Sequence, residues 1–336
     1  MKIQEGKMKN VLVIDLLEES GHVQTNKKFL SILQSEFDVS FITSSSYSKV
    51  IGFKKTIELK DAYFRKKGGI LNRLSQIYLL FKINEFINDT KYDSVIFLSY
   101  ETISTFLYSK LSKNRRVFLF NHNNIDQLLS SKIKAYCFRS LGDEFVHLSY
   151  EKYISDFIEY EFNKESKVVF HPLAFKNHGP KDETTIRVFA PSASGVSKAT
   201  DLVSILEKIE GVTCNIKGDP KLSSSSCRVQ SRFDDYEHLM QTSNFVIILA
   251  EYNYRVSGVA YEGLSCGCKL ILDKSRFSEF LASKYPSDVV IISSIDELAN
   301  ILTDENYSPS TVHTELQDSQ SDKAILKQLQ SIFSAG

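Results

Sequence analysis

Short apolar runs that alternate with helically spaced stretches constrain the fold of this chain more than any other sequence feature. The run at 10–16, NVLVIDL, is rich in β-branched residues and too short for a helix, whereas the stretch at 18–37 places large apolar residues at helical spacing. Further runs of the first kind in the N-terminal half lie at 38–44, 93–100, 116–124, 144–149 and 167–173. This alternation predicts an α/β fold with a doubly wound parallel sheet.

A polar segment with glycine and proline at 176–185, KNHGPKDETT, interrupts the pattern and is typical of a linker. A second series follows, with strand-like runs at 186–193, 212–218, 244–250 and 288–293, while the polar tract at 303–322 has no periodicity and indicates a loop. We therefore expect a first domain over 1–176, a second over 186–321, and a C-terminal helix within 322–336 that packs back on the first domain. Ligands of open α/β sheets bind at the carboxyl ends of the strands, so we expect a cleft between two facing domains.

Composition limits the possible partners and the cellular compartment of the protein. The 336 residues include 41 basic and 41 acidic side chains, and this balance argues against a nucleic-acid partner. Five cysteines, an odd number in a long chain, predict no disulfide framework and fit a reducing compartment. No apolar run approaches the ~20 residues needed to span a bilayer, and the charged N-terminus lacks a signal-peptide core. We expect a cytoplasmic protein.

The stretch YRVSGVAYEGLSCGCKLI at 254–271 carries the most specific chemistry. It follows the strand predicted at 244–250, so its loop should lie at a strand's carboxyl end and a helix N-terminus, where unpaired amides favour an anion. Ser257 and Gly258 permit close backbone approach, and Arg255 offers a bidentate phosphate contact. Glu262, one helical turn further on, could accept hydrogen bonds from ribose hydroxyls. The alternative is that Arg255 and Glu262 are solvated surface charges.

This stretch resembles the donor-binding motif of GT-B glycosyltransferases, particularly the retaining family 4 group. That motif runs glutamate, seven residues, glutamate, a small-residue helix, glycine and a strand. The resemblance implies that Glu262, at the second glutamate, holds the nucleotide ribose, and that the loop with Ser257 and Gly258 meets the diphosphate. Tyr254 replaces the first glutamate, beside the donor sugar, so the identity of the sugar stays open.

A second motif of the family places an arginine and a lysine on the diphosphate after the first strand of the second domain. In FAPSASGVSKATDL (189–202), Lys198 stands at the lysine position and Ala193 where the arginine would be. We expect Arg255 to supply the missing positive charge.

The resemblance also assigns two places in the first domain. The turn EESGHVQ (18–24), with Ser20, Gly21 and His22, corresponds to the turn over the donor sugar and acceptor, although no G-x-G-x-x-G fingerprint is present. His122, in the strand-end sequence FNHNN, corresponds to a histidine that contacts the donor sugar near its anomeric carbon, and is the predicted catalytic residue. The remaining histidines are predicted to be structural: His147, His171, His178, His238 and His313.

No metal is expected, because Asp234 and Asp235 open a predicted helix, where acidic residues are ordinary. The segment 53–86 combines an excess of lysine and arginine with interleaved aromatic residues. Such a segment can lie on an anionic membrane surface, or it can be the solvated face of a core helix. In the family this region faces the acceptor.

The sequence thus predicts a metal-independent hexosyltransferase type of enzyme without a cofactor. It would move a sugar from a UDP- or GDP-sugar, with retention, to a glycan or lipid-linked acceptor in bacterial surface polysaccharide synthesis (O-antigen, capsule or lipopolysaccharide), with peripheral contact at the inner membrane through 53–86. The alternatives are a GT-B-fold sugar-nucleotide epimerase and a non-catalytic nucleotide-sugar-binding subunit.

Overall fold

The computed structural model describes residues 9–64, 69–110, 116–174, 181, 185–192, 196–303 and 313–334. The chain divides into two compact units, one formed by 1–172 with 320–336 and the other by 173–319. Most of the predicted linker at 176–185, namely 176–180 and 182–184, lies outside the described residues.

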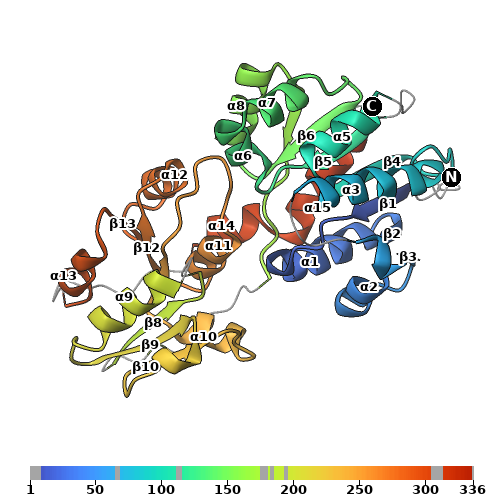
Figure 1. Cartoon of the computed structure of the whole chain (residues 1–336). Helices are drawn as coiled ribbons and strands as arrows, with labels where there is room; N and C mark the ends of the chain where they lie inside the picture. The colour runs from blue at the N-terminus through green and yellow to red at the C-terminus, as the bar shows by residue number, and fades with distance from the viewer. Residues whose placement is uncertain are drawn as a thin grey trace, which may run out of the picture. The chain divides into compact units, whose positions relative to one another are not determined.

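The first unit is built on a seven-stranded sheet in the order β3-β2-β1-β4-β5-β6-β7, and every neighbouring pair is parallel (Figure 1). Its strands are β1 (Asn10–Asp15), β2 (Asp38–Ser44), β3 (Thr56–Leu59), β4 (Ser94–Ser99), β5 (Val117–Phe120), β6 (Phe145–Ser149) and β7 (Ser166–Val168). The central strand β1 is apolar on both faces and fully buried from Val11 to Ile14, as expected for a parallel sheet covered by helices on both sides. The edge strand β3 was not predicted, because it is short, half-exposed and charged.

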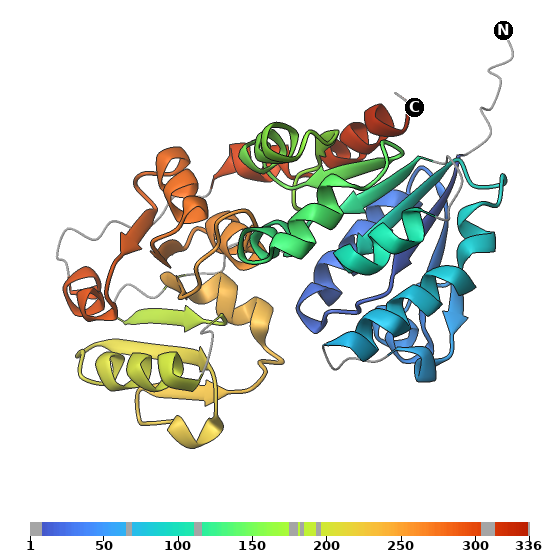
Figure 2. The same ribbon diagram turned by 45° about the horizontal axis from the view of Figure 1, so that its top comes forward.

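Helices connect and cover these strands. They are η1 (Ser20–His22), α1 (Val23–Gln34), α2 (Ser45–Ile51), η2 (Asp61–Tyr63), α3 (Ile70–Lys82), α4 (Asn84–Ile87), α5 (Thr102–Ser109), α6 (Asn124–Ser130), α7 (Lys132–Arg139), α8 (Lys152–Phe162) and the C-terminal α15 (Asp322–Ser334). Helix α15 lies with the first unit (Figure 2). Its Phe333 ring contacts those of Phe37 and Phe118, and Asp322 pairs with Lys28 of α1 at 2.7 Å. Within the described ranges, no helix is both long and apolar enough to cross a membrane.

The second unit holds a six-stranded parallel sheet in the order β10-β9-β8-β11-β12-β13. The strands are β8 (Ile186–Ala190), β9 (Val212–Lys217), β10 (Cys227–Gln230), β11 (Phe245–Ile248), β12 (Lys269–Asp273) and β13 (Val289–Ile292). The helices are α9 (Val196–Leu206), η3 (Pro220–Leu222), α10 (Tyr236–Thr242), α11 (Gly258–Ser265), α12 (Arg276–Lys284), η4 (Ile295–Glu297), α13 (Leu298–Leu302) and α14 (Thr314–Ser319). Alternate residues of β11 enter two separate apolar clusters, so both faces of this sheet are buried. The predicted α/β fold with two doubly wound parallel sheets is confirmed.

The prediction of a loop over 303–322 is wrong in part. Residues 304–312 lie outside the described part of the chain, but 314–319 form helix α14. This helix buries a single apolar side chain, Leu316, and donates a hydrogen bond from Gln317 Nε2 to the Ser265 carbonyl at 2.9 Å. One buried residue in six produces no periodicity, which is why the pattern gave no helical signal.

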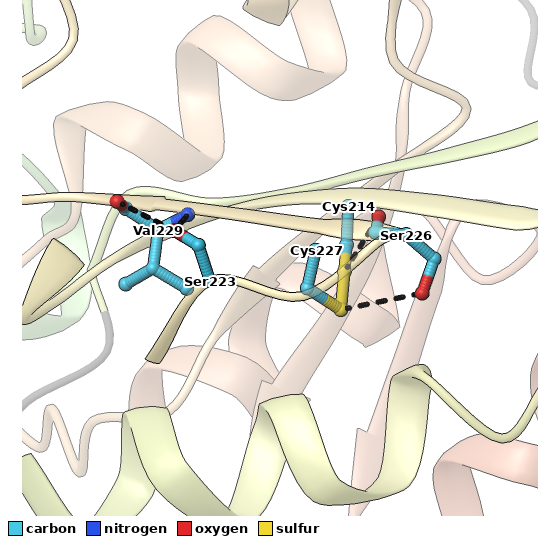
Figure 3. Close-up of a disulfide and its surroundings, with 5 residues drawn as sticks. All are labelled: Cys214, Ser223, Ser226, Cys227 and Val229. Atoms are coloured by element: carbon cyan, nitrogen blue, oxygen red, sulfur yellow. Dashed lines mark hydrogen bonds between the residues drawn. A yellow bond between two sulfur atoms is a disulfide. The ribbon is translucent and has the colours of Figure 1, made fainter. Parts of the chain in front are cut away.

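The prediction that the cysteines form no disulfide is also wrong. Cys214 of β9 and Cys227 of β10 are bonded through their sulfur atoms (Figure 3). They face each other directly in the register of the two strands, with a Cα–Cα distance of 4.7 Å, and both are buried. This pairing is decided by the register of the two strands. The number of cysteines in the sequence carries no information about that register, so the sequence could not predict the bond.

Removing the Cys214–Cys227 bond is expected to lower stability only under oxidising conditions. The bond closes a loop with a sequence separation of 13 residues, and a loop of that size corresponds to about 3 kcal/mol of unfolding free energy. Cys214→Ala with Cys227→Ala should lose about 2–3 kcal/mol in urea denaturation without reductant. With dithiothreitol present, the variant and the parent should differ much less. Equal stability of the two proteins without reductant would contradict the expectation.

Candidate active site

Buried acidic side chains fix the turn that leaves β1. Asp15, at the end of β1, accepts hydrogen bonds from the Glu18 amide at 3.0 Å and from Asn26 Nδ2 at 2.8 Å. Glu18 has a left-handed φ of +53°, and its carboxylate accepts from Thr43 Oγ1 at 2.9 Å and from the Ser44 amide at 2.8 Å. A left-handed conformation costs a residue with a Cβ roughly 1–2 kcal/mol, which these bonds offset. These hydrogen bonds therefore fix the position of the backbone just before η1.

This turn brings His22 onto His122. Their rings stack with centroids 4.2 Å apart and an interplanar angle of 28°, and Glu19 Oε2 lies 3.4 Å from His22 Nε2. Tyr150 lies against His122 at 5.3 Å and against His171 at 4.9 Å. The structure thus joins the predicted turn to the predicted catalytic histidine. It adds His171, which the sequence prediction treated as structural although it also follows a strand end.

Two histidines of this cluster, His122 and His171, are neutral at neutral pH. Burial lowers the pKa of His122 well below its usual value, and the nearby His22 and His171 lower it further. Burial is also the main cause that lowers the pKa of His171, to about 4. A neutral imidazole has one donor and one acceptor nitrogen, so His122 can hydrogen-bond to a hydroxyl without carrying charge.

A cavity of about 510 Å³ lies over this cluster within the first unit. His22 and His122 line it together with Asn123. Its wall carries both signs of charge, from Arg73 of α3 and Lys134 of α7 and from Glu18, Glu19 and Glu101. Its size is in the range of small-molecule sites.

The other predicted residues of the turn contribute less. A Cβ added to Gly21 would meet no heavy atom within 4 Å, so the space around this position does not require glycine. The side chain of Ser20 lies outside the described part of the structure.

In the second unit, Lys198 of α9 is held at the carboxyl edge of the sheet. Its Nζ lies 3.1 Å from the Leu249 carbonyl, directly after β11, and 2.7 Å from Asp273 Oδ2, at the end of β12. These two acceptors use two of the three N–H donors of the ammonium group. The sequence prediction did not include Asp273, and Ala193 lies outside the described residues.

The loop after β11 leads into the N-terminus of α11, as predicted. Ser257 is the N-cap, and its carbonyl accepts from the Ala260 amide at 3.1 Å. Gly258, the first helical residue, therefore belongs to the turn whose amides point out of the helix end. The Arg255 guanidinium lies over the Tyr252 ring, 3.9 Å from its centroid. Leu249, whose carbonyl accepts from Lys198, is the first residue of the loop that leads to α11. Lys198 and the N-terminus of α11 therefore lie at the same edge of the sheet.

Glu262 is buried in α11, so the alternative of a solvated surface charge is wrong for this residue. Tyr236 of α10 donates a hydrogen bond to its Oε2 at 3.0 Å. Burial raises the Glu262 pKa to about 7, and the bond from Tyr236 opposes that rise. Tyr254 is also buried, with the Arg276 guanidinium 4.9 Å from its ring centroid. Tyr236 gave no signal in the sequence, because its role depends on how α10 packs.

The acidic pair at the start of α10 has a local partner. Arg228 pairs with Asp235 at 2.7 Å, and this contact lowers the pKa of that carboxyl group. Among the residues that the structure describes, no group of three or more histidine, cysteine, aspartate or glutamate side chains is arranged to hold a metal ion.

No family model matches the sequence, and no curated protein matches it. Solved structures do match over almost the whole chain. HepE of Anabaena, in complex with UDP and glucose, is 13% identical with a TM-score of 0.74, covering 98% of this chain and 100% of HepE. Sucrose-phosphate synthase of Thermosynechococcus elongatus is 11% identical with a TM-score of 0.68, over 98% and 100% of the two chains. A protein assigned as UDP-N-acetylglucosamine 2-epimerase, from Listeria monocytogenes, is 12% identical with a TM-score of 0.61, over 96% and 91%. The chain has the GT-B fold.

Proposed function

We propose that this protein is a glycosyltransferase that uses a nucleotide diphosphate-sugar as donor. The observation that carries the proposal is the edge of the second sheet that holds Lys198 and the N-terminus of α11, the helix that also contains the buried Glu262. A cation and unpaired amides favour a diphosphate, and a buried carboxylate favours a pair of ribose hydroxyls. HepE, which shares the fold, is seen with UDP and glucose, which supports a UDP-sugar; a GDP-sugar remains within the proposal.

The proposed chemistry is charge stabilisation. As the glycosidic bond to the diphosphate breaks, Lys198, Arg255 and the amides at Ser257 and Gly258 neutralise the charge that develops on the leaving group. His122, neutral and beside the cavity of the first unit, contacts the donor sugar, and Tyr254 contributes to the choice of sugar. We propose transfer with retention and without a metal, to a glycan or lipid-linked acceptor of a bacterial surface polysaccharide.

The test is incubation of the purified protein with UDP-, GDP-, ADP- and CMP-sugars, followed by chromatography of nucleotide and sugar. We expect slow release of free nucleoside diphosphate from one of them, because water replaces the missing acceptor. The matched control is Lys198→Ala, which should lose this activity if it belongs to the protein rather than to a contaminant.

Two other results would overturn the proposal. An isomerised sugar still attached to its nucleotide would indicate an epimerase, the second candidate, which the shared fold of the Listeria protein favours. Tight binding of a nucleotide-sugar without turnover, with or without added glycan acceptors, would indicate a non-catalytic binding subunit.

A further inference from the structure

Helix α3 is apolar on its outer face as well as on its inner face. Leu79 and Leu80 are buried, whereas Leu71, Leu74 and Phe81 are 61%, 56% and 48% exposed. The exposed residues, with Tyr78 between them, follow helical spacing and so form one stripe. A contiguous exposed apolar stripe favours the membrane alternative for 53–86 over a face that contacts water alone.

The stripe continues on neighbouring helices. Leu107 of α5, Leu129 of α6, and Ile133 and Tyr136 of α7 are each at least 44% exposed. Helix α5 packs between α3 and α7, as Figure 1 shows for α3 and α5. Together with the α3 stripe these side chains form what we call the helical patch. Only Val50 and Tyr160, among the large apolar side chains of the described part that are equally exposed, lie outside these helices.

Positive charge predominates around the helical patch, where α6 contributes one acidic residue, Asp126. Helices α3, α5 and α7 contain no aspartate or glutamate. Lys82, Lys110, Lys132 and Arg139 are exposed at their surface or ends. The Lys82 Nζ lies over the Tyr78 ring, 5.5 Å from its centroid, so a cation lies beside an aromatic side chain of the patch.

The helical patch also adjoins the cavity of the first unit. Arg73, on the patch helix α3, and Lys134, on the patch helix α7, both line that cavity. A surface to which the patch binds would therefore lie close to the cavity.

We propose that the helical patch docks the protein on an anionic lipid bilayer. Its apolar side chains would enter the interface between headgroups and acyl chains, and its cations would pair with lipid phosphates. A second copy of this chain bound through the same face would bring like charges together, whereas an anionic bilayer complements both the apolar and the cationic parts. The proposal depends on these helices alone and holds whether or not the donor site is as proposed.

The test is flotation of the protein with phosphatidylcholine vesicles and with vesicles in which phosphatidylglycerol replaces a quarter of the lipid. We expect binding to the anionic vesicles that weakens with salt. Lys82→Gln, Lys110→Gln and Lys132→Gln together should lower the partition coefficient about a hundredfold, since each cation near the surface contributes about a fivefold effect. Leu71→Gln, Leu74→Gln and Ile133→Gln together should also abolish binding. The matched controls outside the patch, Lys152→Gln and Tyr160→Gln, should bind like the parent.

A second measurement does not depend on variants that weaken binding. The chain contains no tryptophan, so Tyr78→Trp introduces a single fluorophore into the helical patch. Its emission should shift to shorter wavelength on addition of anionic vesicles, whereas that of Tyr160→Trp should not. Failure of the parent to bind anionic vesicles would overturn the proposal. So would a dimer in light scattering that the leucine variants convert to a monomer, which would assign the patch to a second copy.

Discussion

Replacing His122 by alanine is expected to lower the turnover of the donor about a hundredfold or more, which is the cost of removing a preorganised hydrogen-bonding group from a reacting centre. Donor affinity should change little, because the diphosphate and ribose contacts are assigned to the second unit. Initial rates of nucleotide release, with donor affinity from calorimetry, separate the two effects. Since the His122 pKa is far below neutrality, this residue should add no inflection to the rate between pH 6 and 8.

The matched control for His122 is His147. It is a buried histidine of strand β6, its pKa is lowered to about 3 mainly by burial, and it stacks on Phe138 with centroids 4.3 Å apart. It is not among the residues around the cavity. His147→Asn should retain turnover in the fraction that stays folded, as measured by circular dichroism. An equal loss of rate in both variants would mean that His122 acts only through the stability of the fold.

Replacing Glu262 by glutamine is expected to weaken donor binding and to stabilise the free protein above pH 7. The loss of a charged acceptor for the ribose hydroxyls should cost about 1.5–3 kcal/mol, a 10- to 100-fold rise in the dissociation constant. The free protein gains because its buried carboxylate no longer has to ionise. Calorimetry with the nucleotide and urea denaturation measure the two quantities.

The pH dependence follows from the Glu262 pKa, which is about 7 in the folded state against an ordinary value of 4.5. Between these values the folded state holds a proton that the unfolded state has released, so the stability of the parent falls as pH rises through this window and is level above it. The fall from this group is at most about 3 kcal/mol. Glu262→Gln should lack it, so the two proteins should diverge from pH 5 to pH 8 in favour of the variant.

Tyr236→Phe provides the control for this interpretation. It removes a hydrogen bond that lowers the Glu262 pKa, so the window of declining stability should extend to higher pH. Parallel stability curves for the parent and Glu262→Gln would show that the carboxylate is not the titrating group.

The sequence predicted most of the strands, because buried parallel strands are short continuous apolar runs and need no tertiary information to be found. The resemblance to the glycosyltransferase family assigned both His22 and His122 to the donor-sugar region, and their rings stack in the structure. The sequence could not predict contacts that depend on packing or register, such as Tyr236 with Glu262, Asp273 with Lys198, or Cys214 with Cys227. The outer face of α3 was read only as basic and aromatic, because exposure is a property of the folded unit.

The disulfide stabilises the edge strand of the second sheet. Strand β10 is at the edge of that sheet, where unpaired backbone groups can recruit a strand from another molecule. The covalent bond from Cys227 to Cys214 ties this border strand to its inner neighbour, so it cannot peel away and exchange with its equivalent in a second copy. Oxidation of this one pair would therefore guard the sheet against strand swapping and fibrillar self-association.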